Sequence, residues 1–197
     1  MEAGTVPSNW DTLYALAEEQ SGFFTTEQAK TIGFSRQRLQ KHLTAGRIER
    51  ARRGIYRLRH FPMRDHDELV VAWLWSEQLG VFSHETALAL HQISDVMPSR
   101  FHLTVPASWG QRRLRVPSGL DLYFDDLPAG DISWFESIPI TTPERTIIDC
   151  IEAHLSPEHV EQALIEAKER GLISPGAHKV LQHRIERMYS AGAQDQK

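Results

Sequence analysis

Residues 25–58, TTEQAKTIGFSRQRLQKHLTAGRIERARRGIYRL, determine the fold expected for the N-terminal part of this chain. Thr25 and Gln28 stand three positions apart, the Ser/Thr-x-x-Gln spacing in which two side chains cap the start of a helix. Gly33 can end this helix, because glycine adopts the left-handed conformation of a helix C-terminus without strain. The pattern therefore predicts a short helix between Thr25 and Gly33.

A second helix is predicted directly after the first. Ser35 can cap a helix from Arg36 to Ala45, and Gly46 can close its far end. Phe34 and Leu39 stand at the positions of a hydrophobic staple. With Leu39 and Leu43 as the apolar stripe, helical spacing leaves the remaining polar side chains facing away. These are Gln37, Gln40, Lys41 and Thr44, with Arg38 beside them.

The end of the stretch has the pattern of a basic β-hairpin. Residues 48–51 and 55–58 read as two strands, separated by a tight turn at Arg52, Arg53 and Gly54. Helix, turn, helix and hairpin in this order predict a winged helix-turn-helix, whose second helix enters the major groove of DNA. A solvated helical hairpin, or a winged helix that binds protein or RNA, remains an alternative.

The charge distribution favours nucleic acid as the partner. Between Gly22 and Arg64 there are 11 Lys or Arg and two acids, a net charge of +9. The whole chain carries −4, so the other residues sum to −13. Such asymmetry is typical of a surface that binds a phosphate backbone.

Composition limits the class of protein. At 197 residues, with 41% hydrophobic and 24% charged residues, the chain is an ordinary soluble globular protein of one large or two small domains. No apolar run approaches the roughly 20 residues that span a bilayer. The N-terminus lacks the features of a signal peptide, so we expect a cytoplasmic protein. The single cysteine, Cys150, excludes an internal disulfide.

The rest of the chain predicts an α+β fold in two domains. Ser8 or Asn9 can cap a supporting helix to about Gln20, which completes a winged helix-turn-helix domain over residues 8–60. A C-terminal domain over 65–189, a small sheet covered by helices, should follow, and residues 190–197 should be a disordered tail. Its expected helices cover residues 65–78, 84–91, 143–153, 157–170 and 175–189, and its expected strands cover 101–105, 113–116, 120–124, 132–135 and 138–140.

Catalytic and metal sites are not expected. His84 and His91 lie seven residues apart, whereas metal-binding helices place histidines at i and i+4. Glu166 and Lys168 resemble a nuclease Glu-x-Lys pair, but they fall inside a helix and point in different directions. We therefore expect no enzyme, no cofactor and no metal, and a metal-dependent nuclease is the third-ranked hypothesis.

The string Thr141–Thr146, TTPERT, is the most distinctive in the second half. Thr142 can cap a helix with Pro143 in its first position, and Glu144 complements the helix dipole. Arg145 and Asp149 at i, i+4 can form an ion pair. A functional surface, with Arg and Thr holding a phosphate, is the alternative to this structural role.

Together these strings resemble the AbiE-type antitoxins and related transcriptional regulators of phage-defence systems. The resemblance rests on GFFTTEQA at 22–29, GFSR at 33–36, GRIER at 46–50, RGIY at 53–56, FSHETAL at 82–88 and TPERT at 142–146, and it covers about Trp10 to Leu172. It implies an N-terminal winged helix that binds operator DNA and represses its own operon. It also implies a C-terminal domain that counters a nucleotidyltransferase-like toxin without a stable complex, as in type IV toxin–antitoxin systems.

Two sets of residues follow as candidate sites. DNA binding is expected of Arg36, Gln37, Arg38, Gln40, Lys41, Thr44, Arg50, Arg52, Arg53 and Arg57. The resemblance adds a C-terminal motif surface formed by Ser83, His84, Glu85, Thr142, Glu144, Arg145 and Asp149. The main hypothesis is a DNA-binding autorepressor, in which a homodimer would match operator symmetry. The alternatives are a solitary regulator without a toxin, and a protein-interaction module whose Arg38, Arg52 and Arg53 bind an acidic partner.

Overall fold

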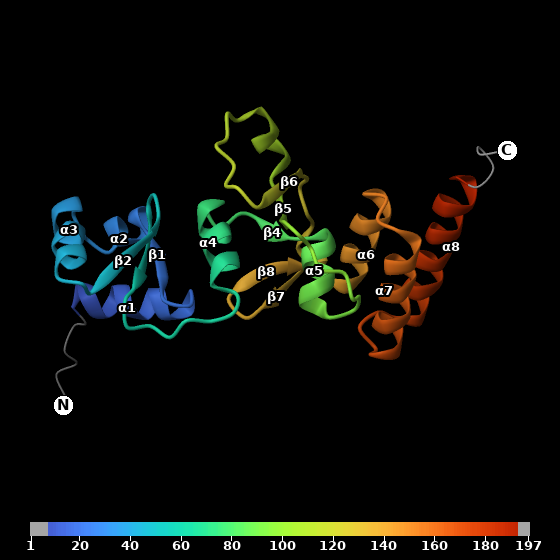
Figure 1. Cartoon of the computed structure of the whole chain (residues 1–197), viewed down its shortest axis with the longest axis horizontal. Helices are drawn as coiled ribbons and strands as arrows, with labels where there is room; N and C mark the ends of the chain where they lie inside the picture. The colour runs from blue at the N-terminus through green and yellow to red at the C-terminus, as the bar shows by residue number, and fades with distance from the viewer. Residues whose placement is uncertain (1–7, 193–197) are drawn as a thin grey trace. The chain divides into compact units, whose positions relative to one another are not determined.

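The computed structural model describes residues 8–192 and has an α+β architecture (Figure 1). The chain divides into two compact units, Met1–Gln78 and Leu79–Lys197. The first contains helices and a small antiparallel sheet, and the second contains a mixed five-stranded sheet with helices. This agrees with the α+β fold class expected from the sequence.

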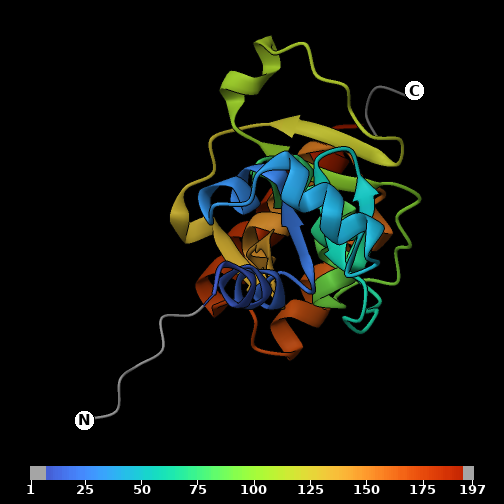
Figure 2. The same ribbon diagram turned by 90° about the vertical axis from the view of Figure 1, so that its left-hand side faces the viewer.

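The first three helices of the first unit begin at the predicted caps. Helix α1 (Asn9–Glu19) starts at Ser8, α2 (Thr26–Thr31) at Thr25 and α3 (Arg36–Thr44) at Ser35, and each side chain accepts a hydrogen bond from the backbone three residues later. Gly33 and Gly46 follow α2 and α3 with φ of 95° and 66°, the left-handed conformation that glycine adopts without strain. Figures 1 and 2 show α1 on the opposite side of the unit from α2 and α3.

The sheet of the first unit has three antiparallel strands in the order β1-β3-β2. These are β1 (Phe23–Thr25), β2 (Ile48–Arg52) and β3 (Ile55–Leu58). The hairpin β2–β3 is confirmed, whereas β1 was not predicted. Arg50 pairs with Tyr56 and Arg52 with Ile55, so Ala51 forms a bulge just before the turn.

A continuous core joins these elements. Phe34 and Leu39, the predicted staple, are each 3% exposed, and His42 stacks on Trp10 with ring centroids 4.5 Å apart. The fully or nearly fully buried members of this core are Leu13, Ala17, Phe24, Ala29, Phe34, Leu39, Ile48, Tyr56 and Leu58. Residues from α1, α2 and all three strands therefore fix the position of α3.

Helix α4 (Asp67–Trp75) contacts β1 and β3 and belongs to the first unit. It buries Leu69, Val70 and Trp73, as expected from its apolar sequence. The sequence had grouped this helix with a C-terminal domain over residues 65–189. The functional domain limits of 8–60 and 65–189 stay predictions.

The second unit is built on a five-stranded sheet in the order β6-β5-β4-β8-β7. Its strands are β4 (Val81–Phe82), β5 (Phe101–Val105), β6 (Leu120–Phe124), β7 (Ile132–Phe135) and β8 (Ile138–Thr141). The pairs β5–β6 and β4–β8 are parallel, and β4–β5 and β7–β8 are antiparallel. Short 3-10 helices η1 (Ala107–Gln111) and η2 (Ala129–Asp131) lie in the connections.

In the second unit, one predicted strand is wrong and one strand was missed. Residues 113–116 alternate as a strand would, but they belong to an irregular connection between β5 and β6. Alternation indicates an extended chain, and it does not ensure that a neighbouring strand is available for pairing. Strand β4 has only two residues, Val81 and Phe82, and gave too short a pattern to recognise.

Four helices complete the second unit: α5 (His84–His91), α6 (Pro143–Glu152), α7 (Pro157–Glu169) and α8 (Pro175–Gly192). Thr142 caps α6 as predicted, and Ser174 accepts a hydrogen bond from the Ala177 backbone. Helix α8 continues to Gly192, beyond the predicted end at 189, and the rest of the predicted tail lies outside the described residues.

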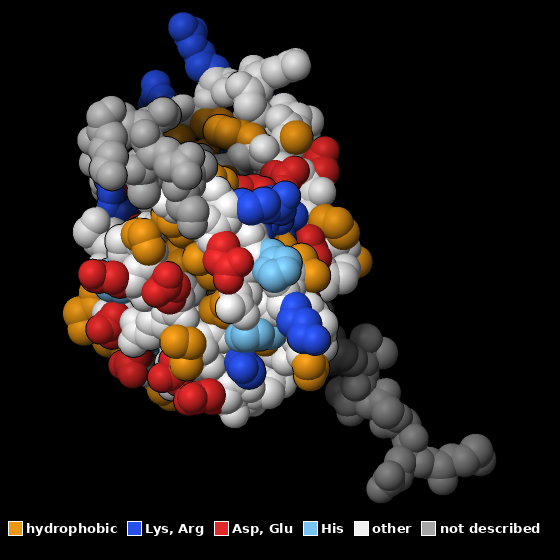
Figure 3. All heavy atoms as spheres, turned by 90° about the vertical axis from the view of Figure 1, so that its right-hand side faces the viewer, with side chains coloured by type: hydrophobic (Ala, Val, Ile, Leu, Met, Phe, Trp, Pro, Cys, Tyr) orange, Lys and Arg blue, Asp and Glu red, His pale blue; other side chains and the backbone are white. Residues whose placement is uncertain are grey.

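Helices α5 to α8 share an apolar core centred on Leu88, Ile147, Ile151 and Leu181. The outer face of the last helices carries acidic, basic and hydrophobic side chains interspersed (Figure 3). Within residues 8–192, the structure contains no helix that is long and apolar enough to cross a membrane.

Candidate nucleic-acid interface

Helix α3 presents its polar side chains to solvent. Leu39 and the stacked His42 turn toward the core, which leaves the opposite face open by helical spacing. The side chains of Arg36, Gln37, Arg38, Gln40, Lys41 and Thr44 are all exposed. All six therefore lie where a ligand in solution can reach them.

Two of these six side chains are held by local contacts. Arg38 donates through Nη1 to the Gly33 carbonyl at 3.3 Å, and its guanidinium lies 4.7 Å from the centre of the Phe34 ring. The Thr44 hydroxyl donates to the Gln40 carbonyl at 3.0 Å. Arg38 is thus drawn toward the start of α3.

The hairpin carries a second group of arginines. Arg50 and Arg53 are exposed and Arg52 is half-buried, and the Arg50 guanidinium lies 5.7 Å from the centre of the Tyr56 ring. Gly54 adopts φ of 81° at the turn. Its carbonyl accepts hydrogen bonds from the backbone N–H of Thr26 at 2.8 Å and from the Thr26 hydroxyl at 3.2 Å. The tip of the hairpin is therefore fastened to the start of α2.

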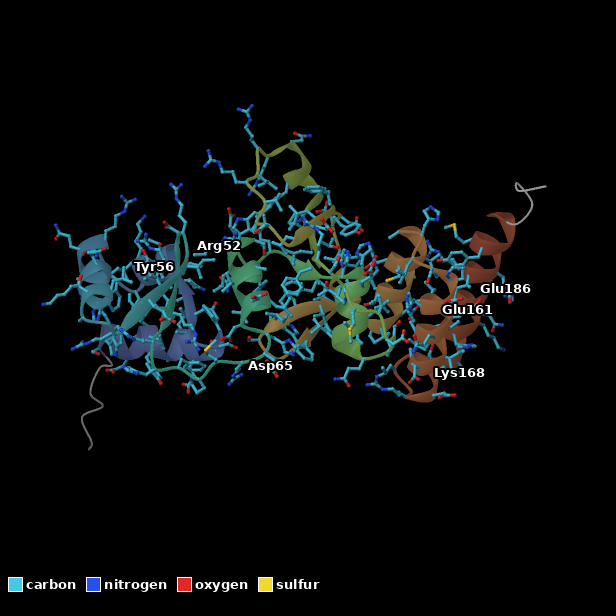
Figure 4. All side chains as sticks on the ribbon, viewed as in Figure 1. Arg52, Tyr56, Asp65, Glu161, Lys168 and Glu186 are labelled. Carbon is cyan, nitrogen blue, oxygen red and sulfur yellow. The ribbon has the colours of Figure 1, made fainter. Side chains whose placement is uncertain are left out.

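A groove of about 400 Å³ lies between α3 and the hairpin. Arg36 and Gln40 line it from α3, and Arg50 and Arg53 line it from the hairpin, of which Figure 4 labels Arg52 and Tyr56. Leu39, Leu43, Tyr56, Thr26 and Gly54 form the remaining walls. The groove thus has an apolar floor and three cationic side chains along its sides.

The electrostatics of α3 agree with this arrangement. Burial lowers the pKa of His42, and the nearby Arg47, Arg38 and Lys41 lower it further. Three cationic side chains thus lie close to α3, and a concentration of positive charge attracts anions.

Arg57 does not belong to this surface. It is 7% exposed and lies in the central strand β3. Its guanidinium donates to the Phe61 carbonyl at 2.8 Å and lies 3.4 Å from Glu49 and 3.6 Å from Asp67. Both faces of β3 are covered, so the alternation of the hairpin did not reveal that this arginine is buried. We correct the prediction that Arg57 contacts DNA.

Of the seven residues of the predicted C-terminal motif surface, Ser83, His84 and Asp149 are buried, Glu85, Thr142 and Arg145 are half-buried, and Glu144 is exposed. Ser83 is 0% exposed and its Oγ lies 2.7 Å from Thr104 Oγ1 and 2.8 Å from His84 Nδ1. His84, 8% exposed, stacks on Tyr123 with ring centroids 3.5 Å apart. Burial lowers the pKa of His84 to about 3, with His102 and Arg145 adding to the effect. Ser83 and His84 therefore join α5 to the sheet.

Arg145 forms ion pairs with three carboxylates. It lies 2.7 Å from Asp149, 2.6 Å from Asp125 and 3.2 Å from Asp131. The predicted i, i+4 pair with Asp149 is confirmed, and the other two partners were not predicted. Burial raises the pKa of Asp149 to about 6, against the lowering effect of Arg145. Arg145 is thus neutralised and has little capacity left for a phosphate.

The other motif residues have ordinary helix positions. Glu85 and Glu144 lie in the first turns of α5 and α6, and Thr142 caps α6. His91 Nε2 lies 2.7 Å from the Thr141 carbonyl, which fixes the end of α5. Glu166 and Lys168 lie in α7, as predicted. Among residues 8–192, no three His, Cys, Asp or Glu side chains are grouped so that they could hold a metal ion.

A basic helix and hairpin on a small helical unit are typical of DNA-binding regulators. Residues 11–59 match the family described as "Transcriptional regulator, AbiEi antitoxin". The chain therefore carries a domain of the AbiEi antitoxin family of transcriptional regulators at its N-terminus. The match ends before the second unit, so the resemblance of the C-terminal strings stays a prediction.

Among the solved structures that are similar to the chain is one that matches most of it. It is the crystal structure of the RV2827C protein from Mycobacterium tuberculosis, with a TM-score of 0.45 and 14% identity over 91% of this chain and 82% of that chain. A likeness of this size does not establish a shared function. No curated protein matches the chain.

Proposed function

We propose that the first unit is a winged helix-turn-helix that binds double-stranded operator DNA, and that the protein represses transcription of its own operon. The observation that carries this proposal is the groove in which Arg36 and Gln40 of α3 face Arg50 and Arg53 of the hairpin. In this class of fold, one helix enters the major groove and the hairpin rests on the adjacent backbone.

The residues divide by the chemistry they offer. Arg36, Gln37 and Gln40 can make bidentate hydrogen bonds to guanine or adenine edges. Lys41, Arg50, Arg52 and Arg53 can hold phosphates, which fixes the register of the protein on the duplex. Arg38 and Thr44, at the two ends of the same helix, are proposed as flanking contacts. Arg57 is left out, because it is buried.

A gel-shift assay on DNA upstream of the protein's own gene, compared with random DNA of equal length, tests this proposal. Gln40→Ala should weaken operator binding by about 1–3 kcal/mol and leave random binding nearly unchanged. Gln182→Ala, an exposed helix glutamine of the second unit, is the matched control. Equal losses on both DNAs would refute the assignment of Gln40, and no binding to either would refute DNA binding.

We further propose that the second unit acts as the antitoxin part against a nucleotidyltransferase-like toxin. The support is the family of the first unit, whose description includes antitoxin, and the resemblance of the C-terminal strings. Growth of cells that co-express the protein with the product of the adjacent reading frame is the relevant test. If that product is not toxic, or if the protein does not restore growth, the protein acts as a solitary regulator.

A further inference from the structure

The connection between β5 and β6, residues 106–119, has an unusual charge for its unit. It contains Arg112, Arg113 and Arg115 and no acidic residue. The rest of the second unit, residues 79–105 and 120–197, has eight Lys or Arg and 16 Asp or Glu. Figure 1 shows this connection projecting from the sheet. The connection is thus positively charged, whereas the rest of the second unit is acidic.

Both ends of this arm, as we name residues 106–119, are anchored. Trp109 is 3% exposed and Pro117 is also buried. The backbone N–H of Ala107 donates to Asp126 at 3.1 Å, and the Arg112 guanidinium lies 4.3 Å from the centre of the Trp109 ring. The base of the arm is therefore held in place by packing. A binding site needs such support from the residues around it.

The middle of the arm presents its charge to solvent. Leu114 N–H donates to the Arg112 carbonyl at 3.0 Å, which forms a tight turn centred on Arg113. Arg113 and Arg115 are exposed, and neither has a hydrogen bond or ion pair within residues 8–192. By contrast, Arg100, Arg145 and Arg184 of the same unit are each paired with an acid. The charges of Arg113 and Arg115 are thus not paired with an acid in the part of the chain that the structure describes.

We propose that the arm is a second DNA-binding element, which holds phosphates of the duplex through Arg113 and Arg115. This inference rests on the proposed function of the first unit and extends it to the second. Guanidinium groups suit phosphate oxygens because they offer several donors in a fixed plane. Nitrogen-tipped side chains extend from this region into solvent in Figure 4.

The chemistry of the arm favours DNA over an acidic protein. Protein interfaces are usually centred on aromatic side chains that enter the partner. Here the aromatic residue, Trp109, is buried in its own unit. The exposed part offers mainly cations, which is sufficient for a polyanion and insufficient for a specific protein contact.

The experiment uses the full chain and its operator fragment over a series of salt concentrations. Removing two phosphate contacts with Arg113→Gln/Arg115→Gln should reduce the slope of log affinity against log salt by about 2. Binding to operator and to random DNA should weaken by a similar factor, because phosphates carry no sequence information. The thermal midpoint should not change, because both side chains are exposed.

Lys168→Gln/Lys179→Gln is the matched control, because it removes two exposed cations from α7 and α8 of the same unit. Its salt slope should equal that of the unaltered protein. If the unaltered protein does not bind DNA, the proposed function fails. If it binds and the Arg113/Arg115 variant retains the full slope, the arm contacts no DNA and this inference alone is overturned. Loss of toxin neutralisation with an unchanged slope would assign the arm to a protein partner and also overturn it.

Discussion

Replacing Arg57 with alanine should destabilise the first unit without impairing a DNA-binding surface. The side chain of Arg57 is 9% exposed and that of its partner Asp67 is 15% exposed, so the change leaves a carboxylate that water solvates poorly. It also removes the donor to the Phe61 carbonyl. Breaking a buried ion pair by removing one partner costs about 3–5 kcal/mol. We expect the free energy of unfolding to fall by about that amount.

Urea denaturation at pH 7 measures this loss, and Arg57→Leu/Asp67→Leu should recover much of it, because the orphaned charge is removed as well. At a temperature where Arg57→Ala stays folded, the salt slope of DNA binding should equal that of the unaltered protein. Arg53→Ala should show the reverse. Its free energy of unfolding should stay within about 0.5 kcal/mol of that of the unaltered protein, and the salt slope of its DNA binding should be lower by about 1. If the Arg57→Ala protein is fully stable but binds DNA with a reduced salt slope, Arg57 contacts DNA and its structural role is refuted.

Two further predictions concern stability. A fragment that ends at Gln78 should unfold at higher urea than one that ends at Arg64, because only the longer fragment keeps α4 and the Arg57–Asp67 pair; equal midpoints would show that α4 does not support the first unit. Burial lowers the pKa of His84 to about 3 in the folded chain. Between pH 7 and 5, His84 therefore takes up a proton in the unfolded chain and not in the folded chain, so this group lowers stability as pH falls. Asp149, with a folded pKa of about 6 and an ordinary value of 3.8, takes up a proton in the folded state and opposes this loss. Between pH 7 and 5, Asp149→Asn should therefore lose roughly 1 kcal/mol more stability than the unaltered protein, and His84→Asn should lose about 2 kcal/mol less. Urea denaturation measures both losses, and equal losses in all three proteins would contradict both pKa shifts.

The sequence predicted the helices of the first unit well, because their ends are determined locally. The Thr25–Gln28 and Ser8–Asp11 capping boxes form within three residues, so no tertiary information is needed. Strand β1 escaped prediction, because Phe23 and Phe24 form a strand only when β3 lies beside them. The burial of Arg57 escaped for the same reason, because it depends on the packing of α4 against β3 in the folded chain.

The second unit was predicted less well, because its motif residues depend on distant partners. Ser83 has the position of a helix cap, but its hydroxyl contacts Thr104 on β5. The Arg145–Asp149 pair could be predicted from i, i+4 spacing, whereas Asp125 and Asp131 reach Arg145 only through the fold of the sheet. The spacing of residues along the sequence thus predicts contacts within one helix, and it does not predict contacts between different helices and strands.

The two hydrogen bonds from Thr26 to the Gly54 carbonyl have a consequence for how DNA sequences are discriminated. They hold the hairpin tip close to the start of α2, so the proposed DNA-binding face should lose little conformational entropy on association. If the hairpin keeps this position when the protein binds DNA, the duplex has to deform to meet it. Sequences that bend or narrow easily at the hairpin contact should therefore bind more tightly, even at base pairs that no side chain touches.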